Sequence, residues 1–340
     1  KDMEIKEQVS LTQFNSFGLS VSAPLFVEVT TSLALQEVLK DPRFENALIL
    51  GGGSNVLLLQ DLSRPVIKIS IPGIRISEEN EQTAIVSAGA GVVWHDLVMW
   101  CIVNNLGGIE NLSLIPGLVG AAPIQNIGAY GVELSDVFYN AIGIGRKTGD
   151  SKIFEAEDCN FGYRDSIFKN ELKDEYVITT LRLSLTKVNH QLHLDYVGIT
   201  QTLDAMGVIT PTLDDVARAV IRIRRAKLPD PSTLGNAGSF FTNPVVLKTK
   251  AAQMASLYPD MPSYSIDDQF TKIPAGWLIE QTGFKGKTFG NVGMHNKQAL
   301  VLVNYGNATG AELWEHAQRV MDAVMSKFDI ELAPEVNLIN

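Results

Sequence analysis

The sequence predicts an α+β fold, in which short strands dominate the first two thirds of the chain and a few helices are interspersed among them. Runs rich in aliphatic and β-branched residues, bounded by Gly and Pro, indicate the strands, and clear examples lie at 47–50, 56–59, 66–71 and 83–88. Helical periodicity is confined to a few segments. The sequence contains no internal repeat and no low-complexity segment.

Three helices are expected before the last third of the chain. Two are short, at about 32–39 and 94–104, and a longer one covers 212–227. Thr212 and Asp215 have the spacing of a capping box, which predicts where the longer helix begins. The apolar residues that recur at helical spacing in it are Val216, Ala219, Val220 and Ile223.

A final helix is predicted from Thr309, with Glu312 three residues later in the arrangement of another capping box. Its length follows from a regular apolar stripe with the period of an α-helix. The residues expected on its buried face are Leu313, Ala317, Val320, Met321, Val324 and Phe328.

Composition limits the class of function. The chain has 340 residues, a length at which two or three domains are expected. The formal net charge of −10 argues against nonspecific nucleic-acid binding, because a phosphate backbone is bound by a basic surface. We find no apolar run long enough to cross a bilayer and no signal peptide, since residues 1–10 are polar and charged. We therefore expect a protein that makes or binds something inside the cell.

Cysteine and histidine usage indicates neither a disulfide framework nor a metal site. Cys101 and Cys159 are the two cysteines, and they form no Cys-x-x-Cys motif, so we expect reduced thiols. The five histidines are scattered, and His95 and His295 lack the paired spacing of metal ligands.

A glycine turn is predicted within 48–59, which reads LILGGGSNVLLL. One strand enters, Gly51, Gly52 and Gly53 turn, and a second strand leaves. Glycine permits positive φ and lets the backbone approach a ligand closely. Successive exposed amides in such a turn form an anion-binding nest. From these residues alone, a tight β-turn with a purely structural role stays open as the alternative. No helix follows directly, so this is not a Rossmann phosphate loop.

A second glycine-rich segment, 116–131, reads PGLVGAAPIQNIGAYG and is almost free of charge. It carries Gln125 and Asn126 among small residues. Such a loop suits a diphosphate or a flat ring when backbone amides supply the hydrogen bonds. A buried structural loop is the other interpretation, although a long stretch without regular periodicity is usually functional.

The chain resembles the UDP-N-acetylenolpyruvoylglucosamine reductases, also called UDP-N-acetylmuramate dehydrogenases, over nearly its whole length. The resemblance rests on several motifs in the right order. These are NSFG at 15–18, GGGSN at 51–55, PGLVGAAPIQNIGAYG at 116–131, GYRDSIFK at 162–169, KLPDP at 227–231, GNAGSFF at 235–241, AGWLIE at 275–280 and PEV at 334–336. Tyr196, in LHLDYVGIT, is similar to the tyrosine of the subgroup whose tyrosine loop folds over the nucleotide.

The resemblance implies the FAD-binding fold of vanillyl-alcohol oxidase and p-cresol methylhydroxylase. Two α+β portions would clasp FAD, at 1–73 and 74–228, with 331–340 returning to the first portion. A third α+β domain at 229–330 would bind the substrate, and Pro229–Pro231 reads as a hinge before it. The loop at 51–55 has no His or Cys to attach a flavin, so we expect non-covalent FAD.

The resemblance also implies the reaction. FAD would mediate the reduction of UDP-N-acetylglucosamine enolpyruvate to UDP-N-acetylmuramate by NADPH, in the synthesis of cell-wall peptidoglycan precursors that underlies cell shape and division. The expected enzyme is cytoplasmic and monomeric, with a UDP-sugar and NADPH as partners, no nucleic acid and no membrane insertion. The chain ends at Asn340, soon after Glu335, where relatives often continue.

Three residues are the predicted catalytic group. Arg164 offers a guanidinium fork for a carboxylate that gains negative charge. Glu335, if protonated, can donate to a developing enolate, and the resemblance assigns proton delivery to Ser239. Each has a plainer interpretation: a surface ion pair for Arg164, a solvated side chain for Glu335 and a turn residue for Ser239.

The resemblance carries two further groups of residues over to this chain. Arg224 and Lys227 share one face of their helix, where a solvated face is the plainer interpretation. The cofactor-binding set is Gly51, Gly52, Gly53, Ser54, Asn55, Pro116, Gly117, Gly120, Ala121, Gln125, Asn126, Gly128 and Arg224. The substrate-binding set is Tyr196, Lys227, Asn243, Lys285 and Gln298.

Two other functions are compatible with part of the sequence. Another flavoprotein of the same fold, acting on a sugar or a lactone, would keep the GGGSN turn but would have no need of the GNAGSFF and PEV motifs. A non-catalytic nucleotide-sugar binding protein would purify without colour and fail to take up flavin. The absorption spectrum of the purified protein separates these functions.

Overall fold

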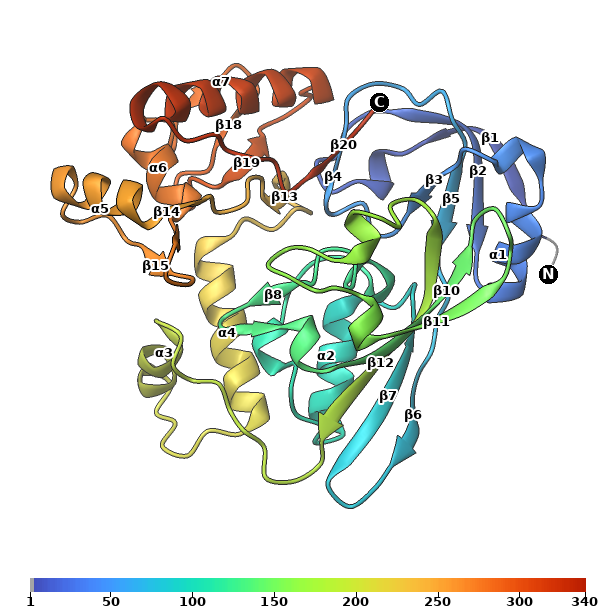
Figure 1. Cartoon of the computed structure of the whole chain (residues 1–340). Helices are drawn as coiled ribbons and strands as arrows, with labels where there is room; N and C mark the ends of the chain where they lie inside the picture. The colour runs from blue at the N-terminus through green and yellow to red at the C-terminus, as the bar shows by residue number, and fades with distance from the viewer. Residues whose placement is uncertain (1–2) are drawn as a thin grey trace. The chain divides into compact units, whose positions relative to one another are not determined.

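A computed structural model describes residues 3–340 (Figure 1). The chain forms two compact units, each made of three chain segments. The first unit contains the chain up to Val9, Ala23–Gly52 and Ser63–Ala226. The second unit contains Ser10–Ser22, Gly53–Leu62 and Lys227–Asn340.

The first sheet of the first unit has the strand order β1-β2-β5-β3. Strands β2, β5 and β3 run parallel, with Phe26 and Leu48 both opposite Val66. Helix α1 packs on this sheet through Leu35 and Val38, which are buried with the aliphatic side chains of the strands. The bounds are Ile5–Ser10 for β1, Ser22–Val29 for β2, Ser32–Leu39 for α1, Leu48–Leu50 for β3 and Val66–Ile69 for β5.

The second sheet of the first unit is antiparallel, in the order β11-β10-β12-β7-β6. Helix α2 covers it, because Trp94, Leu97 and Val98 join the same buried cluster as the inward residues of β7 and β12. The strands are β6 (Ile74–Glu79), β7 (Thr83–Gly89), β10 (Phe138–Gly145), β11 (Ser151–Glu155) and β12 (Tyr176–Thr186), and α2 is Trp94–Val103.

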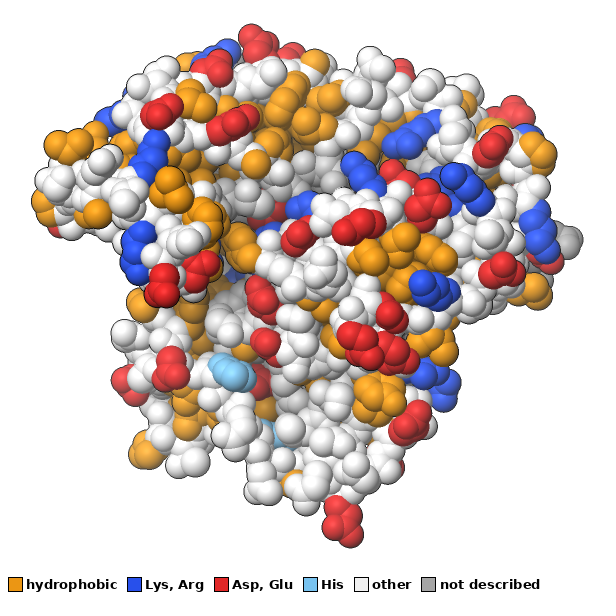
Figure 2. Space-filling model, in the orientation of Figure 1, with side chains coloured by type: hydrophobic (Ala, Val, Ile, Leu, Met, Phe, Trp, Pro, Cys, Tyr) orange, Lys and Arg blue, Asp and Glu red, His pale blue; other side chains and the backbone are white. Residues whose placement is uncertain are grey.

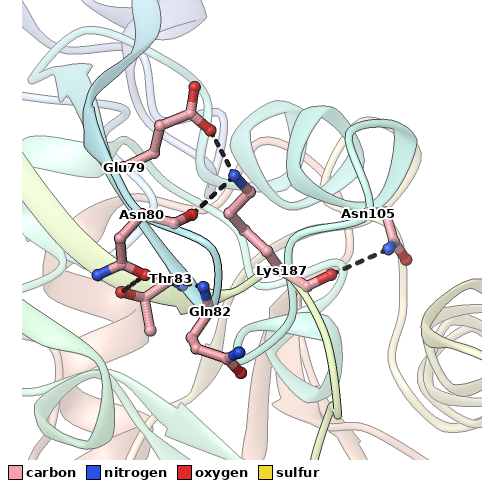
Figure 3. A network of polar contacts seen from close by, with 6 residues as sticks. All are labelled: Glu79, Asn80, Gln82, Thr83, Asn105 and Lys187. Carbon is pink, nitrogen blue, oxygen red and sulfur yellow. Dashed lines mark hydrogen bonds and ion pairs between the residues drawn. The ribbon is translucent and has the colours of Figure 1, made fainter.

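A polar network fixes the point where β12 ends (Figure 3). Lys187 donates to the carboxylate of Glu79, the last residue of β6, at 2.7 Å and to the carbonyl of Asn80, in the turn that follows, at 2.8 Å. Its own carbonyl accepts from the side chain of Asn105 at 3.3 Å. Lys187 is therefore held from two sides immediately before the segment that carries Tyr196.

Two helices follow that segment in the first unit. Helix α3 (Ile199–Ala205) packs against α4 (Leu213–Lys227) through a small buried cluster. The predicted capping box of α4 is confirmed: the Thr212 amide donates to the Asp215 carboxylate at 2.9 Å, and the Asp215 amide donates to the Thr212 hydroxyl at 3.2 Å. The short strands β8 (Gly128–Ala129) and β9 (Val132–Glu133) form a hairpin in the same unit.

The second unit contains a sheet of order β13-β19-β18-β17, a smaller sheet β14-β16-β15 and the parallel pair β20-β4. Helix α7 packs beside β18, β19 and α6 (Figure 1). The strands are β4 (Val56–Leu58), β13 (Gly235–Ser239), β14 (Val245–Leu247), β15 (Tyr264–Ser265), β16 (Phe270–Lys272), β17 (Thr288–Phe289), β18 (Val292–Met294), β19 (Val301–Asn304) and β20 (Asn337–Ile339). The helices are α5 (Lys248–Leu257), α6 (Ala275–Gln281) and α7 (Gly310–Phe328).

The predicted strands and helices form where expected, to within a few residues at their ends. One detail of α7 differs from the prediction: Met321 is only partly buried, whereas His316 is 1% exposed. Thr309 does cap the helix, accepting from the Glu312 amide at 3.1 Å. None of the helices in residues 3–340 is both long and apolar enough to cross a membrane. On the face drawn in Figure 2, acidic and basic side chains are interspersed.

Candidate active site

The glycine turn forms between β3 and β4, as predicted. Gly53 has φ +63°, and a Cβ there would lie 1.8 Å from the Phe14 carbonyl oxygen, so this position requires glycine. The Ser16 amide donates to the Gly53 carbonyl at 2.9 Å and fixes the turn. Among residues 3–340, the backbone amides of Gly52 and Ser54 have no hydrogen-bond acceptor. These amides can bind an anion without breaking a protein contact.

The segment 116–131 approaches the first half of that turn within the first unit. A Cβ on Gly52 would lie 3.3 Å from the Gly117 Cα, so the two glycine-rich backbones nearly touch. Gly120 packs as closely on Ala90, where a Cβ would lie 2.6 Å from the Ala90 Cβ. The segment also contains left-handed residues, with φ +46° at Asn126 and larger positive values at glycines. Because glycines have no side chain, a ligand that binds here would contact main-chain groups.

Arg224 is a partly buried cation of the first unit. Burial lowers the pKa of its guanidinium, and a hydrogen bond to Tyr130 opposes that effect. Its Nε is buried and has no hydrogen-bond partner among the described residues. A buried donor without an acceptor costs free energy unless a ligand supplies one. Gly52 and Arg224 both belong to the first unit, and a free backbone amide and an unpaired guanidinium Nε are donors that suit an anionic, diphosphate-bearing cofactor such as FAD.

Tyr130 contacts both Arg224, through a hydrogen bond, and Tyr196, through its ring. It is not among the predicted site residues. The Tyr130 and Tyr196 rings meet edge to face, with centroids 5.3 Å apart. Tyr196 nevertheless stays 50% exposed. Burial raises the pKa of Tyr130, which keeps its hydroxyl protonated. The sequence could have indicated Tyr130 as a site residue through its position in the GAYG motif, but its partners Tyr196 and Arg224 are distant in sequence.

Arg164 lies at the tip of a two-residue turn in which Gly162 and Asp165 are paired. Its φ is +50°, an uncommon conformation for a residue with a side chain. The guanidinium donates to the Gly128 carbonyl at 2.8 Å and lies over the Tyr163 ring, 5.2 Å from its centroid.

The structure brings Ser239 and Glu335 together within the second unit. Ser239 ends β13 after an irregularity in its pairing with β19, with φ +67° at the preceding Gly238. Such bulges re-aim side chains and are common beside active sites. The Glu335 amide donates to the Phe240 carbonyl at 2.7 Å, and the next pair along, Phe241 and Pro334, also forms a bridge.

The other predicted substrate-binding residues each have their own contacts. Asn243 accepts from the Ala275 amide at 2.9 Å, at the start of α6. Lys285 lies 3.2 Å from the Glu280 carboxylate. Gln298 is partly buried beside Gly276, and Lys227 is exposed at the end of α4.

The predicted site residues are divided between the two units. The first unit holds Gly51, Gly52, Pro116, Gly117, Gly120, Ala121, Gln125, Asn126, Gly128, Arg164, Tyr196 and Arg224. The second unit holds Gly53, Ser54, Asn55, Lys227, Ser239, Asn243, Lys285, Gln298 and Glu335. Asn55 reaches the PEV motif directly, since its side-chain amide lies 3.4 Å from the Glu335 carbonyl. Within residues 3–340, no group of three or more His, Cys, Asp or Glu side chains could hold a metal ion.

Comparison with known proteins gives the family. Residues 23–152 match the FAD binding domain, and 230–339 match the C-terminal domain of UDP-N-acetylenolpyruvoylglucosamine reductase. Reductases of that name from Flavobacterium johnsoniae and Pseudomonas aeruginosa are 48% and 45% identical to this chain, each covering 99% of it and 100% and 99% of their own length. The solved structure of the Thermus caldophilus reductase covers 100% of both chains with a TM-score of 0.71 at 22% identity, which confirms the fold. The chain belongs to the UDP-N-acetylenolpyruvoylglucosamine reductase family.

Proposed function

We propose that Arg164, Ser239 and Glu335 carry out the chemistry of this family in the present chain. The family reaction is the reduction of UDP-N-acetylglucosamine enolpyruvate by NADPH, in peptidoglycan precursor synthesis, and the chain is an FAD-dependent oxidoreductase. Backbone pairing of Glu335 with the residue after Ser239 carries the assignment of these two residues.

The reaction adds a hydride to the terminal carbon of the alkene and a proton to the carbon that bears the ether oxygen. The redox chemistry would be supplied by bound FAD, through which a hydride from NADPH would reach the substrate. As the terminal carbon gains hydride, negative charge spreads over the second carbon and its carboxylate. Arg164 can stabilise that carboxylate by charge-assisted hydrogen bonds, and a protonated Glu335 can donate to the developing enolate. Ser239 then gives its hydroxyl proton to the second carbon and regains one from solvent.

Binding roles are proposed for two further groups. The glycine turn, the segment 116–131 and Arg224 would hold FAD without a covalent bond. This is supported by free amides in the turn and by the unpaired Nε of Arg224. Tyr196, Lys227, Asn243, Lys285 and Gln298 would hold the UDP-sugar. Exposure of Tyr196 supports its membership of the tyrosine-loop subgroup.

Domain limits, location and assembly are proposed on the same basis. FAD would be bound by 1–73, with 331–340 returning to it, and by 74–228, and substrate by 229–330. The family matches, at 23–152 and 230–339, support a boundary near 229. We further propose a monomeric, cytoplasmic enzyme, since the reaction consumes NADPH and the two cysteines are not bonded to one another.

An anaerobic two-step experiment tests the function. Purified yellow protein is first bleached with one equivalent of NADPH, and the UDP-enolpyruvyl sugar is then added. Rapid return of the oxidised flavin spectrum together with UDP-N-acetylmuramate as product is the expected result. Reoxidation by oxygen alone, coupled to the turnover of a simple sugar or lactone, would identify the alternative flavoprotein instead.

A further inference from the structure

The side chain of Asn126 is fully engaged by protein groups. It is 1% exposed. Its Nδ2 donates to the Gly162 carbonyl at 3.0 Å and to the Glu133 carboxylate at 3.2 Å, and its Oδ1 accepts from the Ser135 amide at 2.9 Å. Both N–H groups of this amide are used, so it has no donor left for a cofactor, and one lone pair of Oδ1 is the capacity that remains. Because the side chain is also buried, a contact between FAD and this residue would use its backbone.

The partner of Asn126 that bears on the reaction is Gly162. Its backbone amide and carbonyl pair with those of Asp165 at 3.1 and 3.2 Å, which closes the turn with Arg164 at its tip. By binding the same carbonyl oxygen, Asn126 anchors the base of this turn to the segment that includes Gly128. Gly128 in turn accepts from the Arg164 guanidinium at 2.8 Å. The backbone turn that carries Arg164 and the Arg164 guanidinium are thus both hydrogen-bonded to the same short segment, residues 126–128.

Lys169 supplies a second restraint on the same turn. Its ammonium group donates to the Arg164 carbonyl at 2.9 Å. The left-handed backbone of Arg164, with φ +50°, costs free energy for a residue with a side chain and persists only where the surroundings impose it. Lys169 and Asn126 are polar groups that bind this turn from outside it. Lys169 belongs to neither predicted binding set, and Asn126, which the sequence places in the cofactor-binding set, has both of its side-chain donors bound to protein groups.

We propose that Asn126, assisted by Lys169, is a positioning residue that sets the orientation of the Arg164 guanidinium for the enolpyruvyl carboxylate. This inference rests on the proposed role of Arg164. It assigns the Asn126 side chain to the substrate half-reaction and removes it from flavin binding. Misplacing a catalytic group by about 1 Å can cost on the order of a hundredfold in rate, so a weakened anchor should have a measurable effect.

The test uses stopped-flow measurement of the two half-reactions in the holoenzyme. Asn126→Asp keeps the size of the side chain and its tolerance for positive φ, but it loses the donors to Gly162 and Glu133 and sets a carboxylate against that of Glu133. We expect substrate-driven flavin reoxidation to slow by roughly ten- to a hundredfold. The rate of flavin reduction by NADPH and the Kd for FAD should stay within about threefold, since these do not depend on Arg164. A raised Kd for FAD with normal reoxidation would overturn the inference.

A double-variant comparison separates positioning from a general structural effect. In an Arg164→Lys background, Asn126→Asp should add little further loss, because both changes remove the same interaction. If the double variant instead lost activity by the product of the two single-variant factors, the inference would be overturned. The Arg164→Lys single variant tests the proposed role of Arg164 separately. If it leaves reoxidation unchanged, that role fails.

Two further variants complete the design. Asn105→Asp is the matched control, since Asn105 is also an asparagine of positive φ, 53°, whose amide donates to a backbone carbonyl, that of Lys187. It should leave both half-reactions within about twofold. If Asn126→Asp does not fold, Lys169→Met takes its place, with Lys169→Arg expected to restore the rate. Normal reoxidation in Lys169→Met would then overturn the inference.

Discussion

The backbone amide of Glu335 donates a 2.7 Å hydrogen bond to the carbonyl oxygen of Phe240, the residue that follows Ser239. Phe240 is fully buried, so this bond joins the two chain segments at a rigid point. A proposed proton donor and a proposed enolate stabiliser are thereby held in fixed register. Loss of either side chain should affect the reaction without disturbing that backbone link.

Ser239→Ala should bind FAD and accept electrons from NADPH nearly as the unchanged enzyme does. Substrate-driven reoxidation should then slow by roughly a hundred- to ten-thousand-fold, because a positioned proton donor is lost. Ser239→Cys should keep part of the activity, since a thiol can also donate a proton. Stopped-flow absorbance of each half-reaction measures both effects.

Ser256→Ala serves as the control for this change, because Ser256 is exposed on α5 and its hydroxyl only caps the Gln253 carbonyl. It should leave both half-reactions unchanged. If Ser239→Ala slowed flavin reduction by NADPH, or left reoxidation untouched, the serine would be structural and another group would deliver the proton.

Removal of the Tyr196 hydroxyl or the Lys227 ammonium should act mainly on substrate binding. Tyr196→Phe and Lys227→Ala should raise the KM for the UDP-sugar far more than they change flavin reduction by NADPH. Removing one hydrogen bond to a charged group costs about 1.5–3 kcal/mol, or roughly ten- to a hundredfold in KM. Steady-state kinetics with varied UDP-sugar measure this, and equal loss of both half-reactions would contradict the binding role.

Denaturation of the protein should release FAD as the free, unmodified cofactor. The turn from Gly51 to Asn55 contains no His or Cys that could hold the isoalloxazine covalently. After acid or heat denaturation and centrifugation, the yellow colour should therefore appear in the supernatant. Flavin retained on the precipitated chain would refute a non-covalent site.

Stability should depend on pH through His316. Its imidazole is 1% exposed between the rings of Phe284 and Phe289, with centroids 5.6 and 5.0 Å away. Burial, with a smaller contribution from Arg319, lowers its pKa from 6.5 to about 4. The folded state thus holds the neutral ring, while the unfolded state takes up a proton below pH 6.5. This contribution to stability is full above pH 6.5 and is lost as the pH falls toward 4.

The measurement is the free energy of unfolding in urea at pH 7 and at pH 5. The unchanged protein should lose about 2 kcal/mol through His316 over this interval. His316→Asn should be less stable at pH 7 but should show a difference between the two pH values that is smaller by about that amount. An unaltered pH dependence in the variant would show that other groups govern it.

The sequence predicted elements whose determinants are local. Thr212 and Asp215 cap α4 because the two residues that form the box lie three apart, and the run of glycines permits the positive φ that Gly53 adopts. The motif order also identified the family, which physical pattern alone could not have done.

Features set by distant contacts were not predictable from the residues. His316 is buried because Phe284, before β17, and Phe289, in β17, pack against it from elsewhere in the chain, whereas the helical period favoured Met321. The left-handed Arg164 and the bound amide of Asn126 likewise depend on partners 36 residues apart, whose meeting no local propensity indicates.

The parallel pairing of β20 with β4 has a consequence for biosynthesis. A ribosome makes β4, immediately after the glycine turn, near the start of the chain and makes β20 only after Val336. In the interval the nascent β4 has an open edge, which invites pairing with the wrong strand. Closing so long a loop also carries an entropic cost that only late contacts repay. The second unit is therefore completed late in synthesis, and chaperone protection of the growing chain should matter most before residues 337–339 emerge.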